Sequence, residues 1–374
     1  MKLTKKVSRD WYLEDLIGAG FPLEYWDVVN LVSEEYSDSN ILKKNYLRKI
    51  KSYSELEDLI VKNSNQNVIY ILLLNYKIFS IDIYKLLTKY NSLTVFFNWG
   101  ALPVKSYSLY RTALKYKHLK IHNLIYKIYG KFIEVTYSKL KLINPYTISF
   151  NAGSESLKTP INATKKIPFN LCDYDQFLHA RARTRKLIKK KYAVFLDINL
   201  PTQRDLDLEK LQKIDPVSYF NSLNNFFEKI EEKYDLEVII ALHPKSSYSK
   251  KIFLDRKVTQ LNTAELVKNA HFVITHYSTS VSYAVLFKKP IMFIYTEEML
   301  NAYKYNIIEE INCMARYFDL KSINIDNFSD SEIILKKINK DKYIDYKYKY
   351  LTSKSTEFIP NIKIIIREFK KLQS

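Results

Sequence analysis

Glycine and cysteine are scarce in this chain of 374 residues, and each scarcity excludes a kind of site. The two cysteines, Cys172 and Cys313, form no CxxC pair and have no histidine at ligand spacing. We therefore expect reduced thiols instead of a zinc site or a disulfide framework. All five glycines precede residue 154, so the second half has no glycine-rich dinucleotide turn and no P-loop. This argues against dinucleotide oxidoreductases and P-loop kinases.

Long apolar runs are also missing. The longest, residues 68–74, contains Tyr70 and falls far short of the roughly 20 residues that cross a bilayer. The basic start of the chain is followed by Ser8, Arg9 and Asp10, where a signal peptide needs an apolar run. We therefore expect a cytoplasmic protein without a transmembrane helix.

Acidic residues are outnumbered by basic ones, 40 against 59, which leaves a formal net charge of +19. This excess predicts an anionic partner: nucleic acid, acidic lipid headgroups or a phosphorylated substrate. Charge alone does not choose among the three. Nine of the basic residues, with Glu134 as the single acidic one, lie within residues 105–145.

Short apolar runs alternate with helical patterns from about residue 194 onward, which is typical of βαβ units and a parallel sheet. We expect strands over 193–196, 238–242, 272–275 and 291–295, and helices over 216–234, 263–269 and 279–287, the second of them capped by Thr263. The pattern predicts a doubly wound, Rossmann-like domain over residues 191–345. A closing helix is expected within residues 346–374.

The first 190 residues are less regular but predict a second Rossmann-like domain. Candidate strands cover 23–28, 67–74, 94–97, 147–150 and 166–169, and candidate helices cover 54–62 and 81–90. Apolar residues recur at helical spacing in the insertion 105–145, so we expect a basic helical hairpin broken at Gly130. A helix starting near Asp173 is expected to continue through the basic run that ends at Lys191.

The most informative segment is residues 272–281, where a buried strand leads into small hydroxylated residues and then a helix. Ser278, Thr279 and Ser280, beside His276, would lie at the carboxyl end of a parallel strand, where open α/β sheets bind ligands. Hydroxyl donors and free backbone N–H groups suit a phosphate there. The alternative is ordinary helix capping.

A second motif ends the strand over 238–242. Pro244 turns the chain outward after His243, so the imidazole is expected to face the cleft and contact a phosphate leaving group. The neighbouring Lys245 would offset developing negative charge. Alone, a His-Pro pair is more often a plain strand terminus than a site; the Ser/Thr segment reverses this preference.

The two motifs, "ALHPK" and "VITHYSTSVSYAVLFKKPIMFIY", resemble those of bacterial GT-B sialyltransferases and of related Kdo and capsule-assembly enzymes. They also resemble the teichoic-acid glycerophosphotransferases, although Thr275-His276 stands where those have Thr-Asp. The resemblance covers roughly residues 192–296. It implies the GT-B fold, in which two Rossmann-like domains face a cleft and a C-terminal helix crosses back to the first. It also implies a cytidine-activated donor, with His243 and residues 244–245, 276 and 278–280 holding the nucleotide phosphate.

The resemblance does not identify a general base in this chain, because the acidic pair of the sialyltransferases is missing from the sequence. Asp197 ends the first strand of the second domain and is the leading candidate, with a turn-capping role as the alternative. Acceptor-side candidates, chosen by position at strand ends or near the cleft, are Asp27, Asn98, Gly100, Asp173 and Asp175. Two segments have DxD spacing, residues 173–175 and 205–207, but neither follows a nucleotide-binding strand as the metal site of a GT-A enzyme does. We therefore expect no metal and no cofactor.

These features together predict a metal-independent, inverting glycosyltransferase that moves an acidic sugar from CMP to a surface polysaccharide or lipid-linked glycan. The basic insertion would touch the inner face of the cytoplasmic membrane, or would be a solvated hairpin. Two further activities stay open: a glycerophosphotransferase using a CDP-alditol, and an RNA-binding protein, the latter disfavoured. A sugar-nucleotide epimerase of the same architecture is a third.

Overall fold

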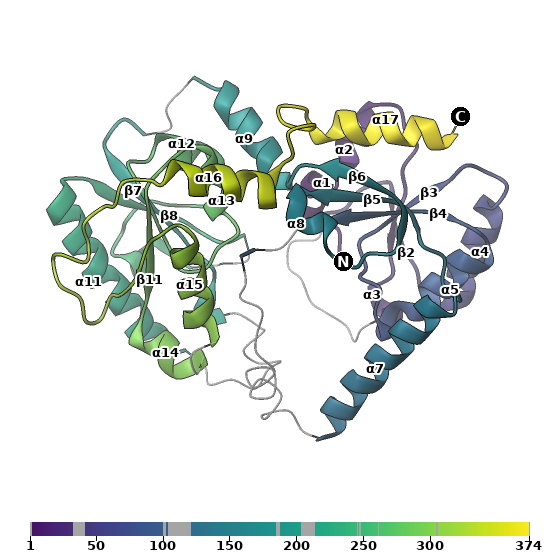
Figure 1. The fold of residues 1–374 in the computed structure, drawn as a ribbon, viewed down its shortest axis with the longest axis horizontal. Coiled ribbons are helices and arrows are strands. Elements are labelled where there is room, and N and C mark those ends of the chain that lie inside the picture. Colours follow the sequence, from purple (N-terminus) through teal and green to yellow (C-terminus); the bar gives the residue numbers. More distant parts are fainter. Residues whose placement is uncertain are drawn as a thin grey trace.

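The computed structural model describes residues 2–32, 42–99, 102–103, 121–184, 188–202, 214–244, 246, 248–260, 262–303 and 306–373. These residues form two α/β domains side by side, each built around a parallel sheet (Figure 1). The predicted fold class of two Rossmann-like domains is confirmed. None of the helices in the described part of the chain is long and apolar enough to span a bilayer.

The first domain contains a four-stranded sheet with the order β3-β4-β5-β6 and a separate parallel pair, β1 and β2. The strands are β1 (Tyr25–Asp27), β2 (Leu47–Lys49), β3 (Ile69–Leu72), β4 (Leu93–Asn98), β5 (Tyr146–Ala152) and β6 (Ala163–Phe169). The helices are α1 (Lys5–Asp10), α2 (Leu13–Gly18), α3 (Val29–Val32), α4 (Tyr53–Asn63), α5 (Ile81–Lys89), α7 (Ile121–Lys139) and α8 (Gly153–Leu157). A 3-10 turn, η1 (Ile78–Ser80), precedes α5.

The second domain contains a six-stranded parallel sheet with the order β12-β11-β10-β7-β8-β9. Its strands are β7 (Tyr192–Leu196), β8 (Glu237–Ala241), β9 (Val258–Thr259), β10 (Val273–Thr275), β11 (Ile291–Tyr295) and β12 (Ser322–Asn324). Around them lie α9 (Cys172–Ala182), α11 (Pro216–Tyr234), α12 (Thr263–Asn269), α13 (Val281–Leu286), α14 (Glu297–Tyr303), α15 (Asn306–Tyr317) and α16 (Lys340–Tyr346). Read from β9, this order matches the 3-2-1-4-5-6 arrangement of the Rossmann fold.

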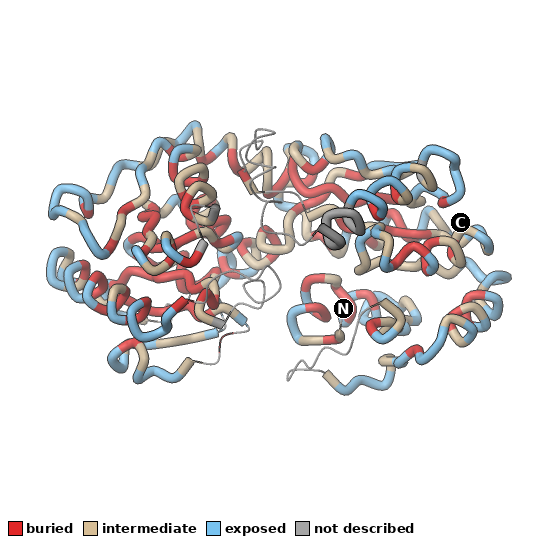
Figure 2. Tube along the Cα trace, turned by 90° about the horizontal axis from the view of Figure 1, so that it is seen from below, coloured by how far each residue is buried: buried red, intermediate tan, exposed pale blue. Residues whose placement is uncertain are grey.

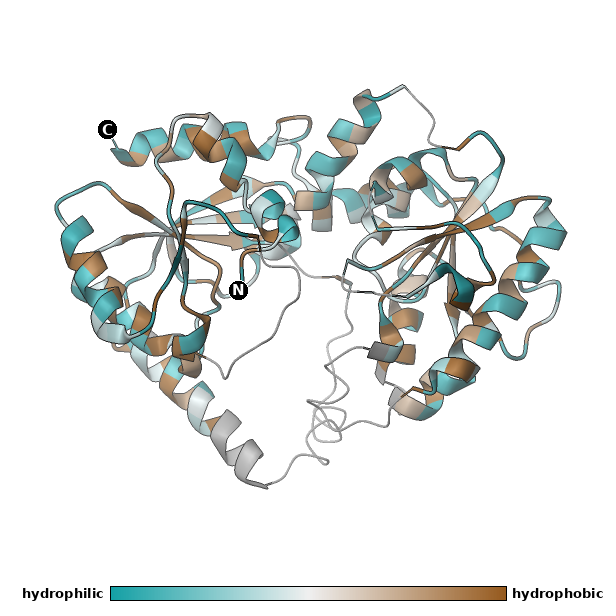
Figure 3. Cartoon of the chain, turned by 180° about the vertical axis from the view of Figure 1, so that it is seen from behind, coloured by the Kyte–Doolittle hydropathy of each residue, from teal (hydrophilic) through white to brown (hydrophobic). Residues whose placement is uncertain are grey.

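Burial explains why the second domain is regular. Buried segments lie in the interior of each half of the molecule (Figure 2). All five residues of β7 are buried, as expected for a central strand covered by helices on both faces. Apolar residues fill the strands and the inner faces of the helices (Figure 3). Helix α11 begins where the Asp215 carboxylate accepts a hydrogen bond from Ser218 N at 2.8 Å, with Pro216 in the first turn.

The chain crosses between the domains at two adjacent places. After β6, α9 packs against α12 and α13 of the second domain, ahead of the boundary that we predicted at residue 190. After the π-helical turn η4 (Lys347–Leu351), the chain returns to α17 (Asn361–Gln373), whose Ile364, Ile365 and Phe369 are buried in the first domain.

Side-chain amides join the two crossings to each other. Asn170 N donates to Asn361 Oδ1 at 3.1 Å, and Asn361 Nδ2 donates to Asn170 O at 2.8 Å. Thr352 Oγ1 donates to Asn170 Oδ1 at 2.6 Å. Because these groups are buried and paired, the crossings form one ordered seam.

Three local predictions were wrong. Helix α7 passes through Gly130 without a break; the glycine instead lets the helix pack closely, since an added Cβ would lie 3.2 Å from Ile78 Cγ2. Helix α9 ends at Ala182, because Arg183 is extended, so the helix does not continue through the basic run. Helix α12 includes Thr263, and Asn262 takes the N-cap position in a left-handed conformation.

Candidate functional site

The strand order of the second domain marks a position for a ligand. From β7 the chain moves outward through β8 and β9, then returns to place β10 on the other side of β7. Open α/β sheets bind ligands beyond the carboxyl ends of the two strands at such a switch. Here those strands end at Leu196 and Thr275, so the site is expected beside Asp197 and the segment that follows Thr275.

A cavity of about 280 Å³ lies at this switch point. Its walls come from the ends of β7, β8 and β10, from α9 and α12, and from α1 of the first domain. The residues singled out from the sequence that line it are Asp173, Asp197, His243, Pro244, Ser278, Thr279 and Ser280. The structure therefore brings the His-Pro and Ser/Thr motifs to one cavity, although His243 and Ser278 are 35 positions apart in the sequence.

Asp197 holds the turn that carries His243. Its Oδ2 accepts from His243 N at 3.0 Å and from Ser246 Oγ at 2.6 Å, while its Oδ1 accepts from Asn199 N at 3.0 Å. The side chain is buried. Both carboxylate oxygens are thus engaged with donors of the loops that follow β7 and β8.

The three hydroxylated residues 278–280 differ in their exposure to solvent. Ser278 is buried and its Oγ accepts from Ser280 N at 3.2 Å, whereas Thr279 is exposed. Helix α13 begins only at Val281, two residues later than predicted, and is six residues long. A helix this short adds little dipole, so the hydroxyl groups are the main donors that this segment contributes.

Asp173 faces the same cavity from α9. Tyr283 OH donates to its Oδ1 at 3.0 Å. Burial raises the pKa of Asp173 to about 6, and the hydrogen bond from Tyr283 opposes that shift. A carboxylate with a pKa close to neutrality is suited to accept a proton from a substrate hydroxyl.

The basic lining of the cavity was missed by sequence reasoning. Lys6 and Arg9 come from α1 and pair with the buried Asp10, and Arg183 pairs with Glu265. Thr4 fixes the start of α1 by accepting from Val7 N at 3.2 Å. The pattern Thr-x-x-Val-x-Arg-Asp was a usable signal for this short helix, although only the fold shows that it meets the second domain.

His276 lies in the core and does not line the cavity. Its Nδ1 donates to Ile294 O at 2.7 Å, so its Nε2 accepts from Tyr219 OH at 2.9 Å. Burial lowers the pKa of this imidazole to about 4. The ring is therefore neutral and joins β10 to β11 and α11.

Three of the acceptor-side candidates, like His276, make their hydrogen bonds away from the cavity. Asp27 Oδ1 accepts from Val29 N at 3.1 Å, and Asp175 accepts from Asn361 N at the start of α17. Asn98 Nδ2 donates to Ser156 O at 2.8 Å and to Thr159 Oγ1 at 2.7 Å. None of the three lines the cavity, and Gly100 and Lys245 lie outside the described residues. Across the described ranges, no group of three or more His, Cys, Asp or Glu side chains is placed to hold a metal ion.

The raised pKa of Asp173 has a consequence for stability. Below about pH 4 the carboxyl is protonated in both the folded and the unfolded chain, whereas above about pH 6 it is ionised in both and its burial disfavours the fold. The melting temperature of the variant Asp173→Asn should therefore exceed that of the wild type by an amount that grows as the pH rises from 4 to 6. Above pH 6 this difference should stay constant. Calorimetry across pH 4–8 measures this, and a difference that shrinks with rising pH would contradict the assignment.

No protein-family model matches the chain, and no curated protein matches its sequence. Among solved structures, spinosyn forosaminyltransferase aligns over 98% of this chain and 91% of its own, with 14% identity and a TM-score of 0.40. The glycotransferase of kitacinnamycin aligns over 98% and 92%, with 9% identity and a TM-score of 0.41. The UDP-GlcNAc 2-epimerase of Neisseria meningitidis aligns over 88% and 86%, with 13% identity and a TM-score of 0.40. Similarities of this size assign neither an activity nor a substrate to this chain.

Proposed function

We propose that the protein is a glycosyltransferase of the GT-B type, and that the switch-point cavity binds the phosphate end of a nucleotide-activated sugar. One observation carries this assignment: His243, Ser278 and Ser280 line a single cavity with the basic side chains Lys6 and Arg9 of the other domain. A cavity of about 280 Å³ is close to the lower limit of about 300 Å³ for ligand pockets, which suits part of a nucleotide sugar.

In the proposed reaction the bond between the sugar and the donor phosphate breaks as an acceptor hydroxyl attacks the anomeric carbon. His243 and the hydroxyl groups of Ser278 and Ser280 donate hydrogen bonds to the departing phosphate, whose charge grows in the transition state. The proposed donor is a CMP-activated acidic sugar. Its carboxylate is a second anion, and Lys6 and Arg9 supply positive charge on the opposite wall.

The acceptor proton needs a base. Asp197, our first candidate from the sequence, has both oxygens occupied by His243 N, Ser246 and Asn199, so we assign it the positioning of the His243 turn. Asp173 takes the proton in the proposed mechanism, because it lines the cavity and its pKa is about 6. Sugar transfer should therefore lose activity as the pH falls below about 6.

Thermal-shift measurements with CMP, CDP, UDP and GDP test the nucleotide. We expect CMP to raise the melting temperature, because ligand that binds only the folded state stabilises it by mass action. His243→Ala should remove most of this shift. Stabilisation by CDP alone would favour the alditol phosphotransferase, and no shift with any nucleotide would contradict a nucleotide-sugar enzyme.

The proposed acceptor is a glycan carried on a lipid, which places the enzyme at an anionic membrane surface. The inner face of α7 is fixed by Glu134, whose carboxylate accepts from Lys77 Nζ at 3.2 Å and Ile78 N at 3.3 Å. On the opposite face, Phe132 is 64% exposed and Ile128 is 62% exposed. Lysines flank these apolar side chains, and the arrangement suits an interfacial helix.

Reversing the charge of Lys131, Lys139 and Lys141 to Glu should abolish sedimentation with vesicles that contain phosphatidylserine. Each lysine near an anionic surface contributes about 1 kcal/mol, so three reversals have a large combined effect. Lys229→Glu, Lys250→Glu and Lys251→Glu apply the same change of charge to the second domain and should leave binding close to that of the wild type. Equal losses in both triple variants would point to net charge instead of α7.

A further inference from the structure

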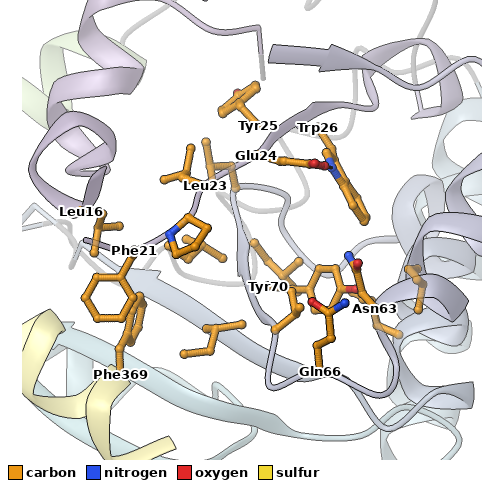
Figure 4. Close-up of a pocket in the computed structure, with 18 of the residues that line it drawn as sticks. Leu16, Phe21, Leu23, Glu24, Tyr25, Trp26, Asn63, Gln66, Tyr70 and Phe369 are labelled. Atoms are coloured by element: carbon orange, nitrogen blue, oxygen red, sulfur yellow. Dashed lines mark hydrogen bonds between the residues drawn. The ribbon is translucent and has the colours of Figure 1, made fainter. Parts of the chain in front are cut away.

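A larger cavity lies within the first domain, separate from the proposed donor site (Figure 4). It has a volume of about 730 Å³ and is bounded by β1, β3, α2, α4, α5 and α17. This volume is inside the range of roughly 300–1,000 Å³ that is usual for small-molecule sites. Its walls are mainly apolar, and they include Phe21, Leu23, Ile71, Leu72 and Phe369.

The cavity divides the apolar core of the first domain. The second domain has one large cluster of buried apolar residues, whereas the first has three smaller ones. Each of the three contributes to the walls, through Leu16, Leu56 and Leu13 respectively. Apolar walls that enclose so large a volume forgo dispersion contacts and offer water few hydrogen bonds. A hydrocarbon would restore those contacts.

The lining of the cavity follows one strand over its full length. β3 is the edge strand of its sheet, all four of its residues are partly exposed, and the lining includes every residue from 66 to 74. The four residues of β3 alone extend over about 13 Å at the usual rise per residue. A linear chain fits a space of this form better than a compact ring system.

The polar part of the lining is gathered mostly near the start of β3. Asn63, Gln66 and Asn67 belong to the turn from α4 to β3, and Gln373 ends α17. Glu24, the one charged side chain of the described lining, accepts a hydrogen bond from Trp26 Nε1 at 2.7 Å. Apart from Glu24, these polar groups are neutral amides, and no lysine or arginine is among the lining residues that the structure describes. The cavity therefore suits an uncharged head group better than a phosphate.

We infer that this cavity binds a lipid with a single hydrocarbon chain and an uncharged, hydrogen-bonding head group. The chain lies along β3, with Ile71 and Phe369 on one side of it and Leu72 and Trp26 on the other. The head group lies at Asn63 and Gln66. Lipid binding here is independent of nucleotide binding in the second domain.

Tryptophan fluorescence provides a test with the intact protein. Trp26 lines the cavity, whereas Trp11 and Trp99 are not among its lining residues and meet edge to face, with ring centroids 5.8 Å apart. The probe is monoolein brominated at its double bond, because bromine quenches indole fluorescence at contact. We expect saturable quenching in the wild type that is largely lost in Trp26→Phe. Equal or non-saturable quenching in the two proteins would overturn the inference.

A cavity-filling variant tests the same site without the fluorophore. The double substitution Ile71→Phe and Leu72→Phe should weaken monoolein binding at least tenfold, measured as the ligand-induced rise in melting temperature. Val61→Phe adds the same kind of bulk at an exposed position of α4 outside the cavity and should bind normally. Undiminished binding by a folded double variant would place the lipid elsewhere. The CMP shift, measured on the same samples, reports the donor site separately.

Discussion

Replacing His243 with alanine is expected to reduce sugar transfer by about 100- to 1,000-fold, the usual effect of removing one group that stabilises developing charge. The reason is geometric: the imidazole lines the switch-point cavity, where the proposed donor phosphate departs. The fold should persist, because the structural hydrogen bond of this residue to Asp197 comes from its backbone N–H. Turnover is measured as CMP release in the presence of acceptor.

His271 supplies a matched control. It is exposed and lies before β10, at the end of the sheet opposite the cavity. Partial desolvation of the ring and the nearby Lys191 and Lys289 lower its pKa. His271→Ala should transfer sugar at the rate of the wild type. If His243→Ala keeps more than about a tenth of the activity, or if both variants lose activity equally, the assigned role of His243 is wrong.

Gly153→Ala is expected to cause the largest loss of stability. Gly153 has φ +68°, which disfavours any residue with a side chain, and an added Cβ would lie 2.3 Å from the carbonyl oxygen of Lys349. Backbone must move to relieve that overlap, so we expect a loss of about 3 kcal/mol or more. Chemical denaturation monitored by circular dichroism measures it.

Gly18→Ala makes the same substitution where space is open. No atom lies within 4 Å of the added Cβ, and alanine favours the last turn of α2. Its unfolding free energy should stay within about 0.5 kcal/mol of the wild type. Similar stability of the two variants would show that α8 and the segment after α16 are less closely packed than described.

Four strands of the second domain, β7, β8, β10 and β11, were predictable because each is a short and mainly apolar run between turn residues. The strand over 291–295 and the helix over 216–234 coincide with β11 and α11. The Asp-Pro start of α11 is a local signal that no tertiary contact overrides. These strands also placed His243 and Ser278 after the carboxyl ends of β8 and β10, the two neighbours of β7, so both residues were expected at the same edge of the sheet.

The rest depended on contacts that leave no trace in a single sequence. His276 stands next to the hydroxylated residues, yet its ring turns into the core, because Tyr219 OH and Ile294 O satisfy both nitrogens. Gly130 suggested a break, but it gives α7 a close contact with Ile78, a residue more than 50 positions away. Arg9 served in the sequence only as evidence against a signal peptide, because the residues that it meets in space belong to another domain.

The paired crossings at Asn170 and Asn361 determine how the two halves can move. Because both connections pass through one seam of buried amides, we expect any relative motion of the two halves to be a rotation about this seam. Such a rotation would move Lys6 and Arg9 toward or away from the sheet that carries His243, and so would close or open the cavity proposed for the donor. A protease that cuts only the loop 353–360 would therefore leave the halves attached through Leu171.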